Sequence, residues 1–239
     1  MVPVSFRLRL GAIALTVAFA ASCPTEAAEI RSVSTVGGGT GLELSGLIRA
    51  GDDAKLAALL RVTPHPTSLA LASLGGNVQA ALAIGTMVRD KALRTVVAPR
   101  AICASACGLV WLAGTPRVLG ENGHVGLHAA YLRRNGVSVE TGAANALIGA
   151  YLGRLGFGDR AIVYLTSAAP DEMTWILPAD RQRYGIAFDA GSAPAVAPSI
   201  VADDHFLSRP MALAGAIASA AVAAVDRLMG RHTTTAADR

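Results

Sequence analysis

Ser105 is the residue whose surroundings best fit covalent chemistry. It stands between Ala104 and Ala106, after the apolar strand-like run 95–98 and before the helix-like run 107–113. At such a junction the first N–H groups of the helix lack intrahelical partners, and the positive end of the helix dipole favours an oxyanion. The two small neighbours leave room for a substrate carbonyl. The stretch therefore predicts a serine nucleophile.

The glycine pair Gly75–Gly76 is a second candidate feature. It separates the apolar run 68–72 from a helix-like run over 78–88. Glycines at this position permit a tight turn and leave backbone N–H groups open to a ligand. A plain strand-to-helix turn is the alternative, but the serine turn that follows favours an anion site. Gly76 and Asn77 are expected to contact substrate.

Two cysteines flank the candidate nucleophile. Cys103 and Cys107 are one helical turn apart, which places their Cα atoms about 6 Å from each other, within the disulfide range. A bridge that clamps the serine turn is therefore feasible, and two buried thiols packing like alanine are the alternative. No second Cys or His pair stands at ligand spacing, so no metal site is expected.

The elements that must position these residues alternate between strands and helices. Apolar runs predict strands at 42–48, 68–72, 95–98, 117–119, 125–128, 175–176 and 186–188. Apolar residues at helical spacing predict helices that begin near Asp52 or Asp53 and at 78, 107, 141, 159 and 178. The segment 32–41 is expected to be a flexible entry. This alternation predicts an α/β fold with parallel strands.

Composition limits the class of protein. The chain has 239 residues, 52% of them hydrophobic, which suits one domain plus appendages. Lys and Arg number 21 against 17 acidic residues, with no basic run. Nucleic acid is therefore not expected as a partner.

The N-terminal residues predict export. Two arginines precede the apolar stretch 10–21, and small residues follow. Residues 1–27 are therefore predicted to be a signal peptide, with cleavage after Ala20 or after Ala27. A lipoprotein site at Cys23 and an uncleaved anchor are the alternatives. The expected location is periplasmic or secreted, where disulfides persist.

Four motifs together resemble a known family. The motifs, in chain order, are SLGG at 73–76, RAICASACGLVWLAG at 100–114, GLHAA at 126–130 and LPADRQRYGIAFD at 177–189. This order resembles that in the proteolytic subunit of the Clp protease. The chain is similar to this ClpP/crotonase superfamily over about 42–189. The resemblance implies an α/β crotonase/ClpP-like fold of repeated ββα units. The sequence departs from that family by a leucine in SLGG where proline is usual, and by alanine after GLH.

The resemblance also implies roles for individual residues. Ser105 would be the nucleophile and His128 the general base, a role that suits an imidazole because its pKa lies near neutrality. The N–H groups of Gly75 and Ala106 would form the oxyanion hole. When YGIAFD at 184–189 is aligned with the end of the family's motif, the family's aspartate falls closest to Ala169, and Asp171, two positions later, would orient the base.

Several of these assignments have rivals. His124 competes with His128 for the base role, and Glu172 is the fallback for the acidic group. A serine–lysine dyad is disfavoured because the only lysines, Lys55 and Lys91, look like solvated surface residues.

The resulting hypothesis is an exported serine peptidase that cleaves peptides or unfolded segments without ATP or any cofactor. It has a signal peptide (1–27), a ClpP-like domain (28–190), a linker (191–199) and a C-terminal helical extension (200–239). Homo-oligomers and peripheral membrane contact through the last helix stay open. The alternatives are a catalytically silent scaffold that binds a peptide or protein, and a crotonase-type acyl-CoA enzyme.

Overall fold

The structure is a computed structural model that describes residues 28–35 and 38–191. The predicted signal peptide, the lipoprotein cysteine Cys23, almost all of the linker and the C-terminal extension lie outside the described residues. The ClpP-like domain expected over 28–190 is therefore the part described below.

A six-stranded sheet forms the main layer, and its central strands are parallel. In spatial order its strands are β1 (Glu29–Ser34), β2 (Thr40–Ser45), β3 (Ser68–Ala72), β4 (Arg94–Val97), β6 (Arg117–Leu119) and β11 (Asp189–Ala190). Both faces of β3 are largely buried, in keeping with its nearly continuous apolar sequence.

A second, smaller sheet carries the candidate catalytic segment. Its strands lie in the order β10 (Thr174–Trp175), β7 (His124–Leu127) and β5 (Ile102–Ala104). The pair β4–β5 precedes the helix α3 (Ala106–Leu112). The pair β6–β7 precedes, after an inserted hairpin, the helix α4 (Gly142–Arg154), and each pair has one strand in each sheet. A bridge from Ser73 to Cys103 extends the same plan to the segment after β3. The expected repeated ββα units are therefore present.

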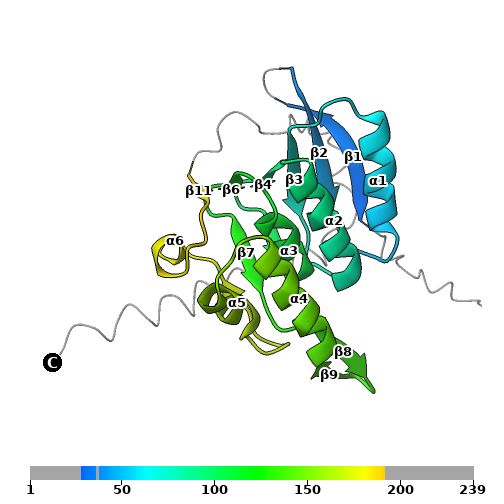
Figure 1. The fold of residues 1–239 in the computed structure, drawn as a ribbon. Helices are drawn as coiled ribbons and strands as arrows, with labels where there is room; N and C mark the ends of the chain where they lie inside the picture. Colours follow the sequence, from blue (N-terminus) through cyan, green and yellow to red (C-terminus); the bar gives the residue numbers. More distant parts are fainter. Residues whose placement is uncertain (1–27, 36–37, 192–239) are drawn as a thin grey trace, which may run out of the picture.

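Helices cover the sheets, as Figure 1 shows. They are α1 (Asp52–Val62), α2 (Val78–Asp90), α3 (Ala106–Leu112), α4 (Gly142–Arg154), α5 (Asp159–Thr166) and α6 (Asp180–Arg183). All seven residues of α3 are buried, so this helix runs through the core. Burial of its apolar side chains contributes about 1.5–3 kcal/mol each for the larger ones.

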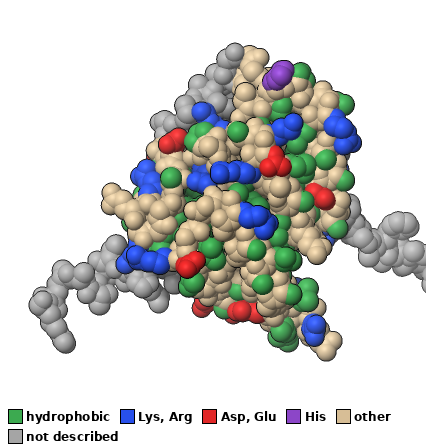
Figure 2. All heavy atoms as spheres, in the orientation of Figure 1, with side chains coloured by type: hydrophobic (Ala, Val, Ile, Leu, Met, Phe, Trp, Pro, Cys, Tyr) green, Lys and Arg blue, Asp and Glu red, His purple; other side chains and the backbone are tan. Residues whose placement is uncertain are grey.

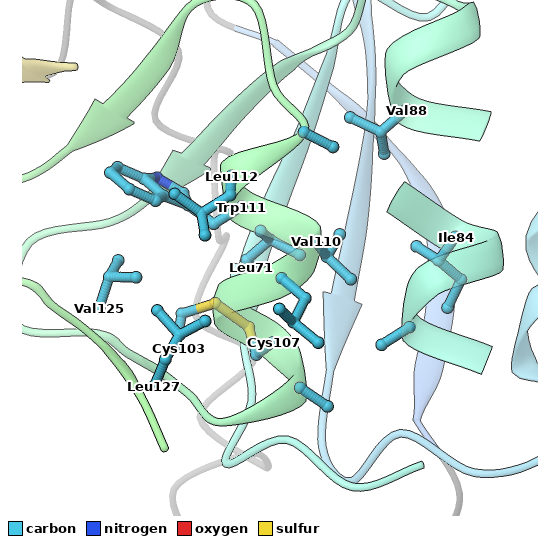
Figure 3. Packing of buried hydrophobic residues seen from close by; sticks show 14 of the residues in the cluster. Leu71, Ile84, Val88, Cys103, Cys107, Val110, Trp111, Leu112, Val125 and Leu127 are labelled. Atoms are coloured by element: carbon cyan, nitrogen blue, oxygen red, sulfur yellow. A yellow bond between two sulfur atoms is a disulfide. The ribbon is translucent and has the colours of Figure 1, made fainter. Parts of the chain in front are cut away.

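Close packing around α3 depends on a small residue and on buried aromatic and sulfur groups. A Cβ on Gly108 would come 2.9 Å from Leu127 Cγ and 3.1 Å from the Gly126 carbonyl oxygen, so glycine at this position lets α3 lie closely against β7. Figure 3 shows the disulfide between Cys103 and Cys107 within the same apolar cluster as Trp111. The core thus surrounds the candidate serine turn directly.

Two strands form where the sequence predicts none. Residues 29–34, predicted in part to be a flexible entry, form β1, which pairs antiparallel with β2. Residues 102–104 form β5, which pairs with β7 and is too short to carry a periodic pattern of its own. Both strands form by pairing with another segment of the chain, so their own residue patterns do not predict them.

Two further differences lie in the second half of the chain. An unpredicted hairpin, β8 (Tyr131–Arg134) and β9 (Val137–Glu140), extends from the body beside the start of α4 (Figure 1). The last strand is β11 at Asp189–Ala190 rather than 186–188, because Ile186 and Phe188 pack into the core outside the ladder.

Two surface properties bear on partners. On the face shown in Figure 2, Lys and Arg side chains are spread among acidic and neutral groups. That face therefore lacks the contiguous basic stripe typical of nucleic-acid binding. Within 28–35 and 38–191, no helix combines the length and apolar character needed to cross a bilayer.

Candidate active site

Ser105 occupies the sharp turn between β5 and α3. Its backbone has φ 55° and ψ −125°, a conformation that residues with a side chain rarely adopt. Holding a non-glycine residue there costs about 1–3 kcal/mol, and such strain persists only where the surrounding structure enforces it. A strained strand-to-helix turn that exposes a serine hydroxyl is the arrangement found at nucleophile elbows.

Strand pairing holds this turn against β7. Ala104 lies opposite Gly126 in the parallel register, and the Ser105 N–H donates to the Gly126 carbonyl at 2.7 Å. The register brings the residues after β5 beside those after β7, and His128 is the first residue after β7. Ser105 and His128, distant in sequence, therefore reach the same end of the small sheet.

The disulfide joins the two sides of the turn. Cys103 in β5 and Cys107 in α3 are bonded, with their Cα atoms 5.1 Å apart, and both are fully buried. The sequence allows either a disulfide or two buried thiols, and the structure contains the disulfide. It closes a short loop around Ser105 and joins strand to helix where the backbone is strained.

Removing this bridge is expected to destabilise the domain. Loop-closure entropy for so short a loop gives about 2 kcal/mol, so the Cys103→Ala/Cys107→Ala double variant should show that loss in urea unfolding. Wild type refolded with both thiols reduced should match it. Equal unfolding midpoints for the oxidised and reduced wild type would contradict the expectation.

The glycine turn packs directly on the serine turn. A Cβ on Gly75 would lie 2.7 Å from the Ser105 Cβ and 2.8 Å from the Ala106 nitrogen. The two turns predicted to share a site are therefore in contact.

The N–H groups of the glycine turn have different surroundings. The Gly75 N–H, predicted to be an oxyanion donor, donates instead to the Ser73 hydroxyl at 3.0 Å. Gly76 lines the cavity with Ser105 and Ala106, and its N–H donates to no backbone group among the described residues. The better-placed backbone donors are consequently Gly76 and Ala106.

His128 is oriented by a backbone carbonyl. Its Nδ1 lies 2.7 Å from the Ala129 oxygen, and its ring is tilted against Tyr131 with centroids 5.4 Å apart. Among the residues that the structure describes, no carboxylate forms an ion pair with His128. Asp171 and its fallback Glu172 are exposed on the turn after Pro170 and do not line the cavity. The predicted third member of a triad is therefore not brought to the base.

The remaining predicted residues serve structural roles. His124 packs edge-on against Trp175, with centroids 5.7 Å apart, and does not line the cavity. The Asn77 side chain caps α2 by accepting the Ala80 N–H at 2.9 Å, and it does not line the cavity that contains Ser105. Lys55 pairs with Asp52 at 2.8 Å, away from Ser105.

A cavity of about 430 Å³ contains both candidate catalytic side chains. This volume suits part of a peptide chain or a small ligand. Its larger apolar lining residues are Leu47, Leu74, Val78, Leu109, Leu127, Leu132, Ile148, Leu165 and Met173. The polar groups are few, so an apolar side chain is the complementary occupant.

The hairpin supplies lining residues that sequence reasoning missed. Tyr131, Leu132 and Arg133 of β8 form part of the cavity wall. The signal was present as Asn135–Gly136, a dipeptide that favours a two-residue hairpin turn, and both residues have positive φ.

In the described ranges, no group of three or more His, Cys, Asp or Glu side chains is arranged to hold an ion.

Comparisons with solved structures give similar folds at low identity. The 1510-N membrane-bound stomatin-specific protease is 15% identical, with a TM-score of 0.49 over 63% of this chain and 77% of that one. ClpP1 from Listeria monocytogenes is 20% identical, with a TM-score of 0.44 over 62% and 91%. The ClpP catalytic domain from Plasmodium falciparum is 16% identical, with a TM-score of 0.44 over 64% and 85%.

No family model matches the chain, and neither does any curated protein sequence. Identities this low do not indicate which side chains react. The chemistry must therefore be judged from Ser105, His128 and their surroundings.

Proposed function

We propose that this chain is an exported serine peptidase that hydrolyses amide bonds in peptides or unfolded segments without a nucleotide. The observation that carries the proposal is the strained Ser105 backbone, at φ 55°, in a cavity shared with His128. Strain of this kind, enforced by strand pairing and a buried disulfide, is typical of functional sites.

The proposed reaction uses His128 as the base. With Nδ1–H donating to the Ala129 carbonyl, Nε2 is left to accept the proton of the Ser105 hydroxyl. The serine oxygen attacks the substrate carbonyl, and the Gly76 and Ala106 N–H groups stabilise the oxyanion. The amine leaves with the proton from His128, and water then releases the acyl group by the same steps.

The cavity favours one class of substrate. Its apolar lining fits a substrate side chain such as leucine or methionine beside the scissile bond. A buried cation or carboxylate that would bind a charged side chain is not among the lining residues; Arg133, the one charged lining residue, is exposed. Peptides with an apolar residue before the cleaved bond are therefore the proposed substrates.

Export is supported by the arginine-led apolar N-terminus and by the Cys103–Cys107 disulfide. A bridge of this kind persists in an oxidising compartment such as the periplasm. An exported enzyme acts away from the cell's ATP, so the proposed hydrolysis proceeds without a nucleotide.

One observation favours a second candidate, a catalytically silent scaffold that binds a peptide. His128 contacts a neutral carbonyl where an active triad has a carboxylate, and a carbonyl stabilises imidazolium less well. The two candidates make opposite predictions about the reactivity of Ser105.

A fluorophosphonate probe separates them. The folded wild type should be labelled at Ser105, the Ser105→Ala variant should not, and Ser167→Ala, which removes an exposed serine outside the cavity, should be labelled like wild type. Absence of labelling in a folded wild type that still binds apolar peptides would favour the scaffold.

A further inference from the structure

A buried carboxylate at the start of α1 faces the nitrogen of Ala28. The Ala28 N–H donates to Oδ2 of Asp52 at 3.3 Å, and both residues are buried, Ala28 to 3% exposure and Asp52 to 0%. Ala28 belongs to the core cluster, next to the start of β1. The nitrogen of residue 28 therefore lies in the core, beside a carboxylate.

The sequence before this nitrogen fits a processing site. Thr25 and Ala27 are small residues at the third and first positions before Ala28, the pattern that signal peptidases accept. Cleavage after Ala20 is the other option, and it would leave residues 21–27 attached. Only the cut after Ala27 would make the Ala28 nitrogen a chain terminus.

Cleavage after Ala27 changes the group that donates to Asp52 from an amide to an amine. A signal-peptidase-type enzyme adds water across the Ala27–Ala28 bond, which leaves a carboxylate on Ala27 and an amine on Ala28. At neutral pH an α-amine is largely protonated, so the nitrogen gains a positive charge and two further protons. An ammonium–carboxylate hydrogen bond is shorter and stronger than one from a neutral amide.

The Asp52 carboxylate already accepts hydrogen bonds from neighbouring donors. Its Oδ2 also accepts the Arg49 N–H at 2.7 Å, and its Oδ1 contacts the Lys55 ammonium at 2.8 Å. The Lys55 side chain is 53% exposed, so water screens that pair, whereas Ala28 is 3% exposed in the chain with residue 27 attached. A charged nitrogen at this buried position requires a counter-charge, and the Asp52 carboxylate that accepts its hydrogen bond supplies one.

We propose that the chain is processed between Ala27 and Ala28, and that the α-ammonium released on Ala28 forms a buried ion pair with Asp52. The ion pair would form only in the mature chain, where it would strengthen the link between Ala28 and α1 that the amide hydrogen bond already makes. The inference does not depend on the reaction of Ser105.

The first test is the mass of the exported protein. The full chain is expressed with its own leader in a bacterium that has a periplasm. The intact mass of the purified product is then measured. The expected product begins at Ala28. A product that begins at Ala21, carries lipid at Cys23 or retains Met1 would overturn the proposal.

The second test measures the ion pair. Ala27→Leu blocks the cut with a large residue, so Ala28 stays an amide. Processed wild type should unfold about 2–4 °C above this variant, the shift typical of one modest stabilising interaction in a domain of this size. Asp52→Asn should abolish the difference, and Asp53→Asn, which changes the neighbouring carboxylate, should preserve it. Equal melting temperatures, or a difference that survives Asp52→Asn, would overturn the pairing.

A chemical measurement covers the case in which Asp52→Asn does not fold. An amine-selective reagent at pH 7 should modify the Ala28 amine of native processed wild type on the order of tenfold more slowly than that of the urea-unfolded chain. Equal rates in the two states would contradict a buried, paired ammonium.

Discussion

Replacing His128 with alanine is expected to lower kcat for hydrolysis of an apolar peptide substrate by about 10²–10⁴-fold, the usual contribution of a general base. The reason is positional. His128 follows β7 directly and lines the cavity that contains Ser105. In the proposed mechanism its loss leaves the serine hydroxyl without a proton acceptor. KM should change little, because the imidazole acts on the serine proton rather than on the substrate side chain.

His124→Ala is the matched control. It removes an identical side chain four residues earlier, at the start of β7, but one that packs on Trp175 outside the cavity. This variant should lose some stability and retain most of the wild-type kcat. If both variants kept the wild-type rate, or if His124→Ala alone lost it, the assignment of His128 as the base would be wrong.

The comparison of the two histidines illustrates what the sequence can predict. The serine turn, the glycine turn and the disulfide depend on residues close in the chain, and periodicity places β4, α3 and β7 to within one or two residues. Strand alternation puts His124 and His128 on one face, but it cannot show that β10 covers His124 with Trp175. That outcome depends on a contact between distant segments.

The position of an acidic partner for His128 cannot be predicted from the local sequence, because it too depends on contacts between distant segments. The sequence singles out Asp171 by its approximate place relative to a terminal motif, whereas its position in space depends on the path of the loop after α5. In the structure this loop turns at Pro170, the Glu172 N–H donates to the Ala169 carbonyl, and both acidic side chains are exposed. Nothing in the spacing of these residues specifies that turn.

The glycine turn shows a subtler limit. The sequence predicts the glycine pair as a source of backbone donors and assigns the donor to Gly75. The Ser73 hydroxyl, two residues earlier, accepts that N–H, and Gly76 lines the cavity instead. A serine that bonds the backbone two residues on is a recognised local motif, so the signal exists in the sequence.

Gly75→Ala is expected to damage both the fold and the site. Gly75 has φ +95°, and its new Cβ would lie 2.7 Å from the Ala104 carbonyl oxygen and from the Ser105 Cβ. The left-handed backbone and the overpacking together should cost about 2–5 kcal/mol of unfolding free energy, measured by urea denaturation. Any relaxation must shift the serine turn, and a shift near ~1 Å should lower kcat on the order of 100-fold.

Gly153→Ala provides the contrast. Gly153 lies in α4 and is exposed, and a Cβ added there would meet nothing within 4 Å. Alanine at this position should stabilise the helix by about 0.5–1 kcal/mol and leave kcat unchanged. A Gly75→Ala protein that folds as stably as wild type and hydrolyses substrate at the wild-type rate would mean that the two turns do not share a site. Because Gly75 touches Ser105 and Ala106 directly, the two effects should instead appear together in Gly75→Ala.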